Sequence, residues 1–587
     1  SDIQNNPGRN TYFFLPLLLG IIGIVFQVSK DKKQFWVLLI FFLFTGLAIQ
    51  FYTNPGIFQP RERDYSLVGS FYIFALWIGL GVYGLYDSFK DWITPKILAP
   101  VVVVVTLLAV PTVMAVQNWD DHDRSNRFTA NSSAKAYLDS CQEDAGAILF
   151  TIGDNDTFPI WYAQEIEHYR TDVRIVCTSL FETDWYVDQM KVAAYESAPI
   201  PSQISHEKYR LGSRDVLYHQ GITENRWPIK DFINWIDSDK PRTKLKYLFE
   251  QNGADLSQYS EDTQNMVYYP TKKIRVPVNK QNVLSSGLVK EKDAHLIVDF
   301  IDIDLPGAIT KKSMMMLDIL ANNDWKRPLY FSGGSFDDAE YLWMKDYLQL
   351  DGLAYKLVPI RTERPNAFEL GRIDTDLMYD IVKKWDWGNA GGDIYHDTQT
   401  RIQSVSFRGN LARLMEALIK ENKMDKAKDI IEISIINMPV EKFGYYTLIE
   451  PFIDGYYKVG ESQKARELFE TLKKKYQERL EYYASVSLDE QYGSIDDIIA
   501  DMEAYRRNID TIIANDTEDM AEKETLIFNE YIDKFQHFYK DEDDMPLPEG
   551  GLESDPDLID TLPVLDTIQA DNTNTDRLHD TVGITAQ

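Results

Sequence analysis

The 587-residue sequence has only two cysteines, Cys141 and Cys177. Two thiols cannot build a disulfide-rich scaffold or a cysteine-based metal centre, although they could form one disulfide. Basic residues are also scarce: 61 Lys and Arg face 91 Asp and Glu, a net charge of −30. Because phosphate backbones are bound by clustered cations, this balance excludes nucleic acid as the main partner. The sequence also lacks GxSxG and HExxH motifs, which disfavours a hydrolase.

Four long apolar runs dominate residues 1–117, at 11–28, 34–51, 67–85 and 97–116. Each approaches the roughly 20 residues that a helix needs to cross a hydrocarbon core, and none carries the regular polar positions of a soluble helix. We therefore predict a transmembrane region with four α-helices.

The charges in the short links predict the orientation of these spans. The links after the first and third runs carry five lysines and are predicted to be cytoplasmic: Lys30, Lys32, Lys33, Lys90 and Lys96. The only basic residues in the link between the second and third runs are Arg61 and Arg63. This asymmetry places that link, and the large region after the fourth run, on the extracytoplasmic side.

The outward link contains the motif Arg61-Glu62-Arg63-Asp64 next to the predicted membrane surface. Two guanidiniums can hold a phosphate in a bidentate way, while the carboxylates orient them or bind a divalent cation. The same four charges could instead neutralise one another in a salt-bridged turn. Both interpretations remain open from the residues alone.

Residues 118–400 show the pattern of an α/β domain. A short helix to Ser140, an apolar strand at 147–152, a helix at 160–169 and a strand at 173–180 form a predicted βαβ unit. Open α/β sheets bind ligands at the carboxyl ends of their strands, where two polar turns follow. The residues of this candidate acceptor or ligand turn are Asp154, Asn155, Asp156, Trp161, Asp184 and Trp185.

Two alternatives apply to the first turn, GDNDTFP. Asp154 and Asp156 could ligate a hard cation, but the spacing does not continue as an EF-hand. Asp and Asn could instead cap the helix that follows, with Pro159 near its first turn. We favour capping over metal binding and assign no metal site.

The α/β character continues to about Pro359, with a strand at 296–303, a helix at 310–322 and a strand at 329–331. Met314, Met315 and Met316 are expected to fill the core. The stretch 200–287 has poor periodicity and is left as an insertion without assigned elements.

Residues 401–540 have a helical period throughout. The segment 425–432 recurs at 463–470, an offset of 38 residues that is close to the tetratricopeptide period, so we predict helical repeats that bind a protein partner. Residues 541–587 contain thirteen acidic residues and one basic residue, which predicts a disordered tail.

Several motifs resemble a Bacteroidetes membrane-protein family of unknown function. They are QPRERDYSLVGSFY at 59–72, GDNDTFPIWYAQEIE at 153–167, TDVRIV at 171–176 and TDWY at 183–186. The family is related to the eukaryotic endoplasmic-reticulum protein O-mannosyltransferase of plexin-type receptors. The resemblance covers about residues 10–359, and the helical repeats are the family's usual C-terminal addition.

The resemblance implies the C-terminal part of a GT-C glycosyltransferase in a bacterial inner membrane, with its large C-terminal region in the periplasm. Such an enzyme passes a sugar from a polyprenyl-phosphate donor to Ser or Thr of extracytoplasmic proteins. Arg61, Glu62, Arg63 and Asp64 then become candidate donor-phosphate contacts. Because the chain begins at Ser1 without Met, we interpret it as the latter part of a longer protein and expect the catalytic acid upstream.

A competing hypothesis is a membrane-anchored adaptor without enzymatic activity. Four spans, an α/β domain, helical repeats and a charged tail require no chemistry. In this interpretation the repeats and the α/β domain bind proteins of the cell envelope.

Overall fold

The computed structural model describes residues 10–54, 63–333, 342–362 and 370–539. The chain forms two compact units, Ser1–Leu472 and Lys473–Gln587. The acidic tail predicted for 541–587 lies outside the described residues.

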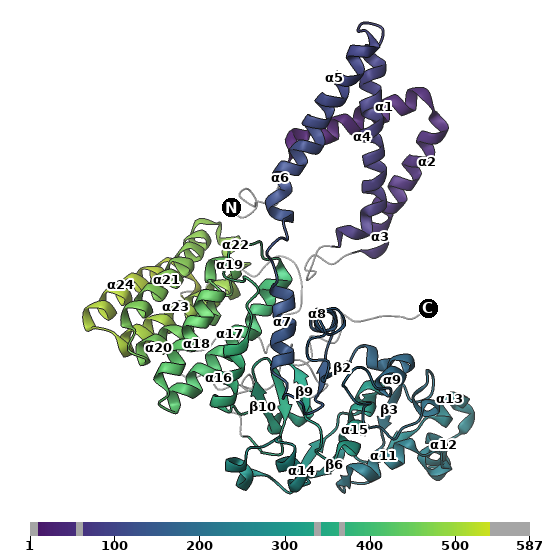
Figure 1. The fold of residues 1–587 in the computed structure, drawn as a ribbon, viewed down its shortest axis with the longest axis vertical. Helices are drawn as coiled ribbons and strands as arrows, with labels where there is room; N and C mark the ends of the chain where they lie inside the picture. Colours follow the sequence, from purple (N-terminus) through teal and green to yellow (C-terminus); the bar gives the residue numbers. More distant parts are fainter. Residues whose placement is uncertain (1–9, 55–62, 334–341, 363–369, 540–587) are drawn as a thin grey trace. The chain divides into compact units, whose positions relative to one another are not determined.

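Four helical segments near the N-terminus are long and apolar enough to cross a membrane (Figure 1). They cover Tyr12–Lys30, Lys32–Thr53, Asp64–Phe89 and Pro95–Trp119, in agreement with the four predicted runs. Their regular helices are α1 (Leu15–Lys30), α2 (Lys32–Leu43), α3 (Ile49–Thr53), α4 (Val68–Phe89), α5 (Pro95–Leu107) and α6 (Val113–His122). Short π-helical turns join α2 to α3 and α5 to α6, and the second turn contains Pro111, which cannot donate a backbone hydrogen bond.

Helices α1 and α4 pack closely because glycines lie at their crossing. A Cβ atom at Gly23 would lie 1.8 Å from the carbonyl oxygen of Trp77, and one at Gly81 would lie 2.0 Å from that of Leu19. The buried Trp77 indole also donates a 2.8 Å hydrogen bond to Gln27 Oε1. Small residues together with one polar contact are the usual means of packing helices in lipid.

A five-stranded sheet forms the centre of the α/β domain, in the order β10-β11-β9-β1-β2. Strands β9, β1 and β2 are parallel, and Leu149 of β1 pairs with Ile175 and Tyr330. Helices α7 and α8 cover the face that carries these three side chains. The bounds are α7 (Thr129–Asp139), β1 (Ile148–Thr151), α8 (Asp154–Glu165), β2 (Arg174–Cys177), α9 (Asp184–Met190), α15 (Lys311–Asn323), β9 (Leu329–Ser332), β10 (Leu348–Asp351) and β11 (Ala354–Leu357).

The predicted βαβ unit is therefore present as β1-α8-β2, but its helix begins earlier than expected. It starts at Asp154 rather than Ile160 and ends at Glu165, so the GDNDTFP segment is mostly first-turn helix. The reason is the Asp156 carboxylate, which reaches back to the Gly153 amide and caps the helix. Pro159 consequently lies inside the helix rather than at its start.

The insertion at 200–287, left unassigned from the sequence, contributes to two small sheets with orders β5-β3-β8 and β4-β6-β7. Their pairings join short strands that are distant in sequence, which leaves little local periodicity. The strand expected at 296–303 is displaced to β7. The bounds are α10 (His206–Tyr209), β3 (Val216–His219), β4 (Trp227–Pro228), α11 (Ile229–Asp237), α12 (Leu245–Gln251), α13 (Glu261–Asn265), β5 (Tyr268–Tyr269), β6 (Lys273–Pro277), α14 (Lys280–Ser285), β7 (Phe300–Asp304) and β8 (Ala308–Thr310).

The core contains Met314, Met315 and Met316 of α15, all almost fully buried, as predicted. Cys141 and Cys177 are buried and free, so the disulfide that the sequence allowed is not formed.

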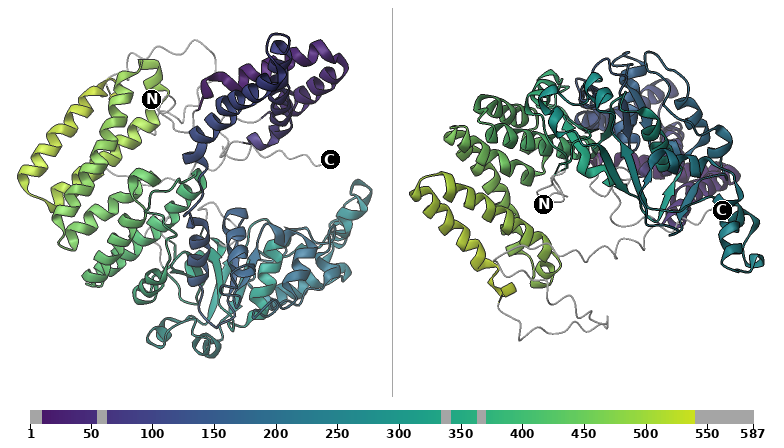
Figure 2. Two further views of the ribbon diagram at one scale, coloured as in Figure 1. Left: turned by 45° about the horizontal axis from the view of Figure 1, so that its top comes forward. Right: turned by 90° about the horizontal axis from the view of Figure 1, so that it is seen from below.

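The C-terminal region is helical, and α17, α18 and α20 lie side by side in both views of Figure 2. The recurring segments fall in α18 and α21, where the equivalent Ala427 and Ala465 are fully buried. The bounds are α16 (Thr375–Lys384), α17 (Thr398–Lys420), α18 (Met424–Asn437), α19 (Val440–Phe443), α20 (Glu450–Lys458) and α21 (Ser462–Ser485). The second compact unit contains the end of α21 with α22 (Leu488–Tyr492), α23 (Ile495–Asn515) and α24 (Glu518–Lys534).

Candidate functional site

The candidate site is the edge of the sheet at which β1, β2 and β9 end. Because the three strands are parallel, their carboxyl ends meet at one edge. Helix α8 begins at Asp154 directly after β1, and α9 begins at Asp184 after β2 and a short 3-10 turn. The two polar turns predicted from the sequence thus lie on neighbouring strands.

Asp156 joins two strands at this edge. Its Oδ2 accepts hydrogen bonds from the Ile152 amide at 2.9 Å and from Ser332 Oγ at 2.5 Å, and its Oδ1 accepts one from the Gly153 amide at 3.0 Å. Since Ser332 ends β9, the carboxylate ties the ends of β1 and β9 together. Asp156 therefore has a structural role, because both of its carboxylate oxygens accept hydrogen bonds from protein groups.

Asp154 and Asn155 face outward at the start of α8 and are exposed. Asn155 Nδ2 donates to Gln399 Oε1 at 3.2 Å, and Gln403 Nε2 donates to the Asn155 carbonyl at 3.4 Å. That carbonyl is available because Pro159, four residues later, has no N–H to donate to it. Both glutamines belong to α17, which the prediction of the site did not include.

Asp184 is fixed by backbone amides at the start of α9. Its carboxylate accepts from the Leu211 amide at 3.2 Å and from the Trp185 amide at 2.8 Å. These hydrogen bonds hold the pKa of the Asp184 carboxyl below its ordinary value. The group therefore stays ionised at neutral pH and can accept further hydrogen bonds.

A row of aromatic rings links the two turns. Phe158 stacks on Trp161 with ring centroids 5.5 Å apart, Trp161 approaches Tyr186 at 6.5 Å, and Tyr186 contacts Trp185 at 5.6 Å. The Tyr186 hydroxyl accepts from the Cys177 amide at 2.9 Å, which anchors the row at the end of β2. Rings beside carboxylate and amide groups suit sugars or polypeptides, which offer apolar faces and hydroxyl or amide groups together.

A cavity of about 40 Å³ lies beside Asn155, where α7 meets α17. Gln403 lines this cavity and also donates the hydrogen bond to the Asn155 carbonyl. The remaining lining residues are Thr129, Ser132, Ser133, Asp386, Trp387, Ala390, Thr400, Ser404, Phe407, Met438 and Phe443. Its volume suffices for a few waters or one small substituent of a larger ligand.

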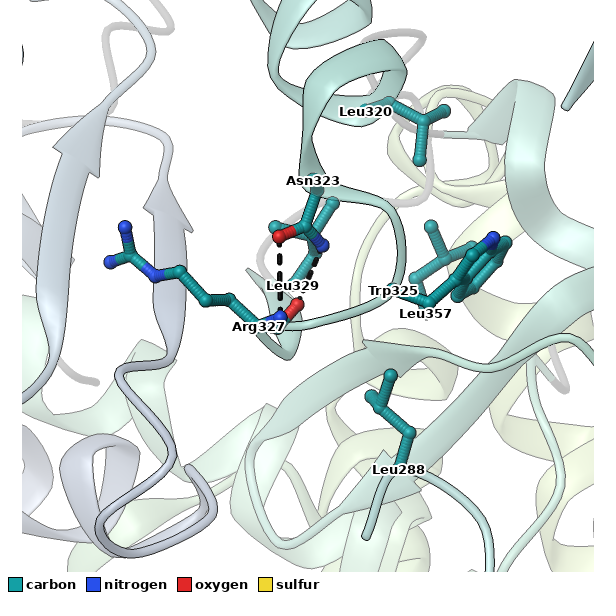
Figure 3. Close-up of a pocket in the computed structure, with 7 residues that line it drawn as sticks. All are labelled: Leu288, Leu320, Asn323, Trp325, Arg327, Leu329 and Leu357. Atoms are coloured by element: carbon teal, nitrogen blue, oxygen red, sulfur yellow. Dashed lines mark hydrogen bonds between the residues drawn. The ribbon is translucent and has the colours of Figure 1, made fainter. Parts of the chain in front are cut away.

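A second cavity, near the start of β9, is too small to be a site (Figure 3). Its volume of about 10 Å³ would hold one water at most. The Arg327 guanidinium points away from it and donates to the carbonyls of Gly146 and Pro199. Asn323 fixes the loop between α15 and β9 through two hydrogen bonds to the Arg327 backbone. This cavity is a packing defect.

The predicted donor-phosphate motif is only partly described. Arg61 and Glu62 lie outside the described residues, whereas Arg63 and Asp64 are exposed at the start of the third apolar segment. Ser66 donates from its amide and its hydroxyl to the Arg63 carbonyl, which forms the 3-10 turn Asp64–Leu67. Within the described residues, no group of three or more His, Cys, Asp or Glu could hold a metal ion.

Residues 130–377 match the family model described as TMEM260-associated domain 2. The match runs from α7 into α16 and includes the sheet, both polar turns and the aromatic row. No significantly similar curated protein or solved structure was found. The α/β domain is thus similar to a domain associated with TMEM260, a eukaryotic protein O-mannosyltransferase.

Proposed function

We propose that this protein is a membrane glycosyltransferase, similar to protein O-mannosyltransferases, that uses a polyprenyl-phosphate sugar to modify Ser or Thr of extracytoplasmic proteins. The observation that carries the proposal is the match of residues 130–377 to TMEM260-associated domain 2, joined to four helices apolar enough to cross a membrane. The proposed setting is a bacterial inner membrane, with the region after α6 in the periplasm.

The link before the third membrane segment would bind the donor. Arg61 and Arg63 would hold the phosphate of the lipid-linked sugar, and Glu62 and Asp64 would orient the guanidiniums or bind a divalent cation. Arg63 precedes the 3-10 turn Asp64–Leu67, which leads into α4. In the proposed arrangement, Arg63 and Asp64 would lie near the depth of a lipid phosphate.

The edge of the sheet would bind the acceptor. Asp154, Asn155 and Asp184 present oxygen and amide groups, and Trp185 and Trp161 belong to the neighbouring aromatic row. In the reaction, the acceptor hydroxyl oxygen attacks the anomeric carbon, the bond from that carbon to the phosphate oxygen breaks, and a carboxylate takes the hydroxyl proton. The cationic link would stabilise the phosphate that leaves.

The second candidate function is a membrane-anchored adaptor. It is favoured by the paired helices of the C-terminal region, in which Ala427 and Ala465 occupy equivalent buried positions in α18 and α21. Such positions would suit tetratricopeptide-like repeats, whose stacked helices form surfaces that bind protein partners. The transferase could use the same helices to recruit its acceptors.

The test is sugar transfer from a polyprenyl-phosphate donor to a Ser/Thr peptide, with membranes that contain the natural full-length protein. We expect Arg63→Ala to raise KM for the donor, and Lys33→Ala, which removes an exposed cation from the first turn of α2, to leave it unchanged. Equal effects of the two substitutions would argue against phosphate binding by the link. Failure to transfer any of several polyprenyl-phosphate sugars would favour the adaptor.

A further inference from the structure

The edge that carries the candidate site also gathers exposed aromatic residues from four elements. Phe128 precedes α7, Phe158 lies in the second turn of α8, Trp185 lies in the first turn of α9, and Tyr395 precedes α17. They are 59, 51, 51 and 44% exposed, respectively. Large apolar side chains exposed together on one edge usually mark a contact surface. We call Phe128, Phe158, Trp185 and Tyr395 the aromatic edge.

Hydrogen bonds, a shared cavity and ring contacts place these four elements together. Gln399 and Gln403 of α17 contact Asn155 of α8, and Thr129 of α7 lines the same cavity as Gln403. The aromatic row from Phe158 to Trp185 connects α8 to α9. The aromatic edge is therefore one region of the α/β domain.

The same region receives the chain from the last membrane segment. Helix α6 ends at His122 and α7 begins at Thr129, so six residues connect them. Seven Cα–Cα steps separate His122 from Thr129, so the start of α7 lies within about 25 Å of the end of α6.

Two arginines in this connection have partners at the aromatic edge. Arg124 lies over the Tyr395 ring, with its guanidinium carbon 4.8 Å from the ring centroid, and Arg127 pairs with Asp397 at 3.0 Å. These two contacts hold residues 123–128 against the residues before α17. The connection therefore spans less than its fully extended length. Aromatic rings with neighbouring guanidiniums are the side chains that favour the water–lipid interface.

We propose that the aromatic edge docks on the interface of the bilayer that α1 to α6 cross. Asp154 and Asp184 begin the helices that carry Phe158 and Trp185, Asp123 precedes Arg124, and Asp397 pairs with Arg127. Carboxylates therefore outnumber the two arginines, so the expected partner is a zwitterionic headgroup layer rather than a strongly anionic one. The inference rests on the membrane assignment of the four helices. It does not require sugar transfer, but it would bring Asp154 and Asp184 to the depth of a lipid-linked phosphate.

Bimane labels at single cysteines test the docking. The full chain is placed in phosphatidylcholine nanodiscs that contain some headgroup-spin-labelled lipid, with Phe158→Cys and Trp185→Cys at the aromatic edge. Val192→Cys and Tyr195→Cys are matched controls: both side chains are more than half exposed, and Arg174, the first residue of β2, donates to the Val192 carbonyl at the opposite edge. The native thiols Cys141 and Cys177 are buried and should not react.

We expect the spin-labelled lipid to quench bimane at 158 and 185 several-fold more than at 192 and 195, and aqueous iodide to show the reverse order. Equal quenching at all four positions, or stronger lipid quenching at the controls, would overturn the proposal. If one of the two edge variants does not fold, Phe128→Cys replaces it. Because fluorescence is read without donor or acceptor, loss of docking is distinguishable from loss of transfer.

Discussion

The indole of Trp77 and the side-chain amide of Gln27 form a buried 2.8 Å hydrogen bond between α4 and α1. Two polar groups in a segment this apolar are tolerated because each satisfies the other. The contact depends on the short separation of the two helices, which Gly23 and Gly81 allow. Larger side chains at these glycines should therefore disturb the packing of α1 against α4.

Gly81→Leu should destabilise the protein in detergent by about 1–3 kcal/mol, because overpacking separates the helices. Its Cβ would lie 2.0 Å from the Leu19 carbonyl oxygen, whereas a Cβ at Gly79 of the same helix has nothing within 4 Å. Thermal unfolding followed by fluorescence-detected gel filtration measures the change. Gly79→Leu is the control, and an equal loss in both variants would contradict the close contact.

Asp156→Ala should destabilise the α/β domain, at about 1–3 kcal/mol for each donor left unpaired. The substitution removes the acceptor of the Ile152 and Gly153 amides and of the Ser332 hydroxyl. Asp154→Ala, at an exposed position two residues earlier, should change stability by less than about 0.5 kcal/mol. Denaturant unfolding of both variants separates a structural role from a ligand-binding role, and similar stability of the two would refute the assignment.

Lys356→Met should cost about 3–5 kcal/mol, because it leaves the Asp351 carboxylate buried without its cation. The two side chains pair at 2.7 Å in the β10–β11 hairpin and are only 3 and 1% exposed. The exposed pair Lys384–Glu143 is the control, and Lys384→Met should cost less than about 1 kcal/mol. Combining Lys356→Met with Asp351→Leu should recover part of the loss. A full loss in the double variant would show that another contact is responsible.

His396 should make the protein sensitive to mild acid. Burial lowers the pKa of its imidazole, which donates from Nε2 to the Ala390 carbonyl at 2.9 Å and packs on Phe443. The unfolded chain therefore binds the proton more readily, so stability is lost as the pH falls below about 6.5, the ordinary pKa of histidine, and levels off below the folded pKa. Thermal unfolding between pH 8 and pH 5 should show a smaller pH dependence for His396→Gln. An unchanged slope would assign the acid sensitivity to other groups.

The four long apolar helices and the central βαβ unit were predictable from local sequence. Runs of about 20 apolar residues have few alternatives to a membrane helix, and the β1-α8-β2 order follows from short apolar runs that flank one segment of helical composition. The helix start was misplaced because a polar first turn resembles a loop. The capping bond from Gly153 to Asp156 shows why the helix extends to Asp154.

The sequence by itself determined that this protein has four apolar spans, an α/β domain with two polar turns, and a helical C-terminal region. These features follow from composition and periodicity, which can be read from stretches as short as one or two helical turns or strands. Only the tertiary structure decided that Asp156 accepts a hydrogen bond from Ser332, 176 residues away. It also decided that Gln399 and Gln403 of α17 form hydrogen bonds with Asn155. It also decided that Phe128, Phe158, Trp185 and Tyr395 share one edge. Contacts between residues so far apart in the sequence depend on the order of the strands in the sheet and on how the helices pack. A local sequence pattern contains no information about either.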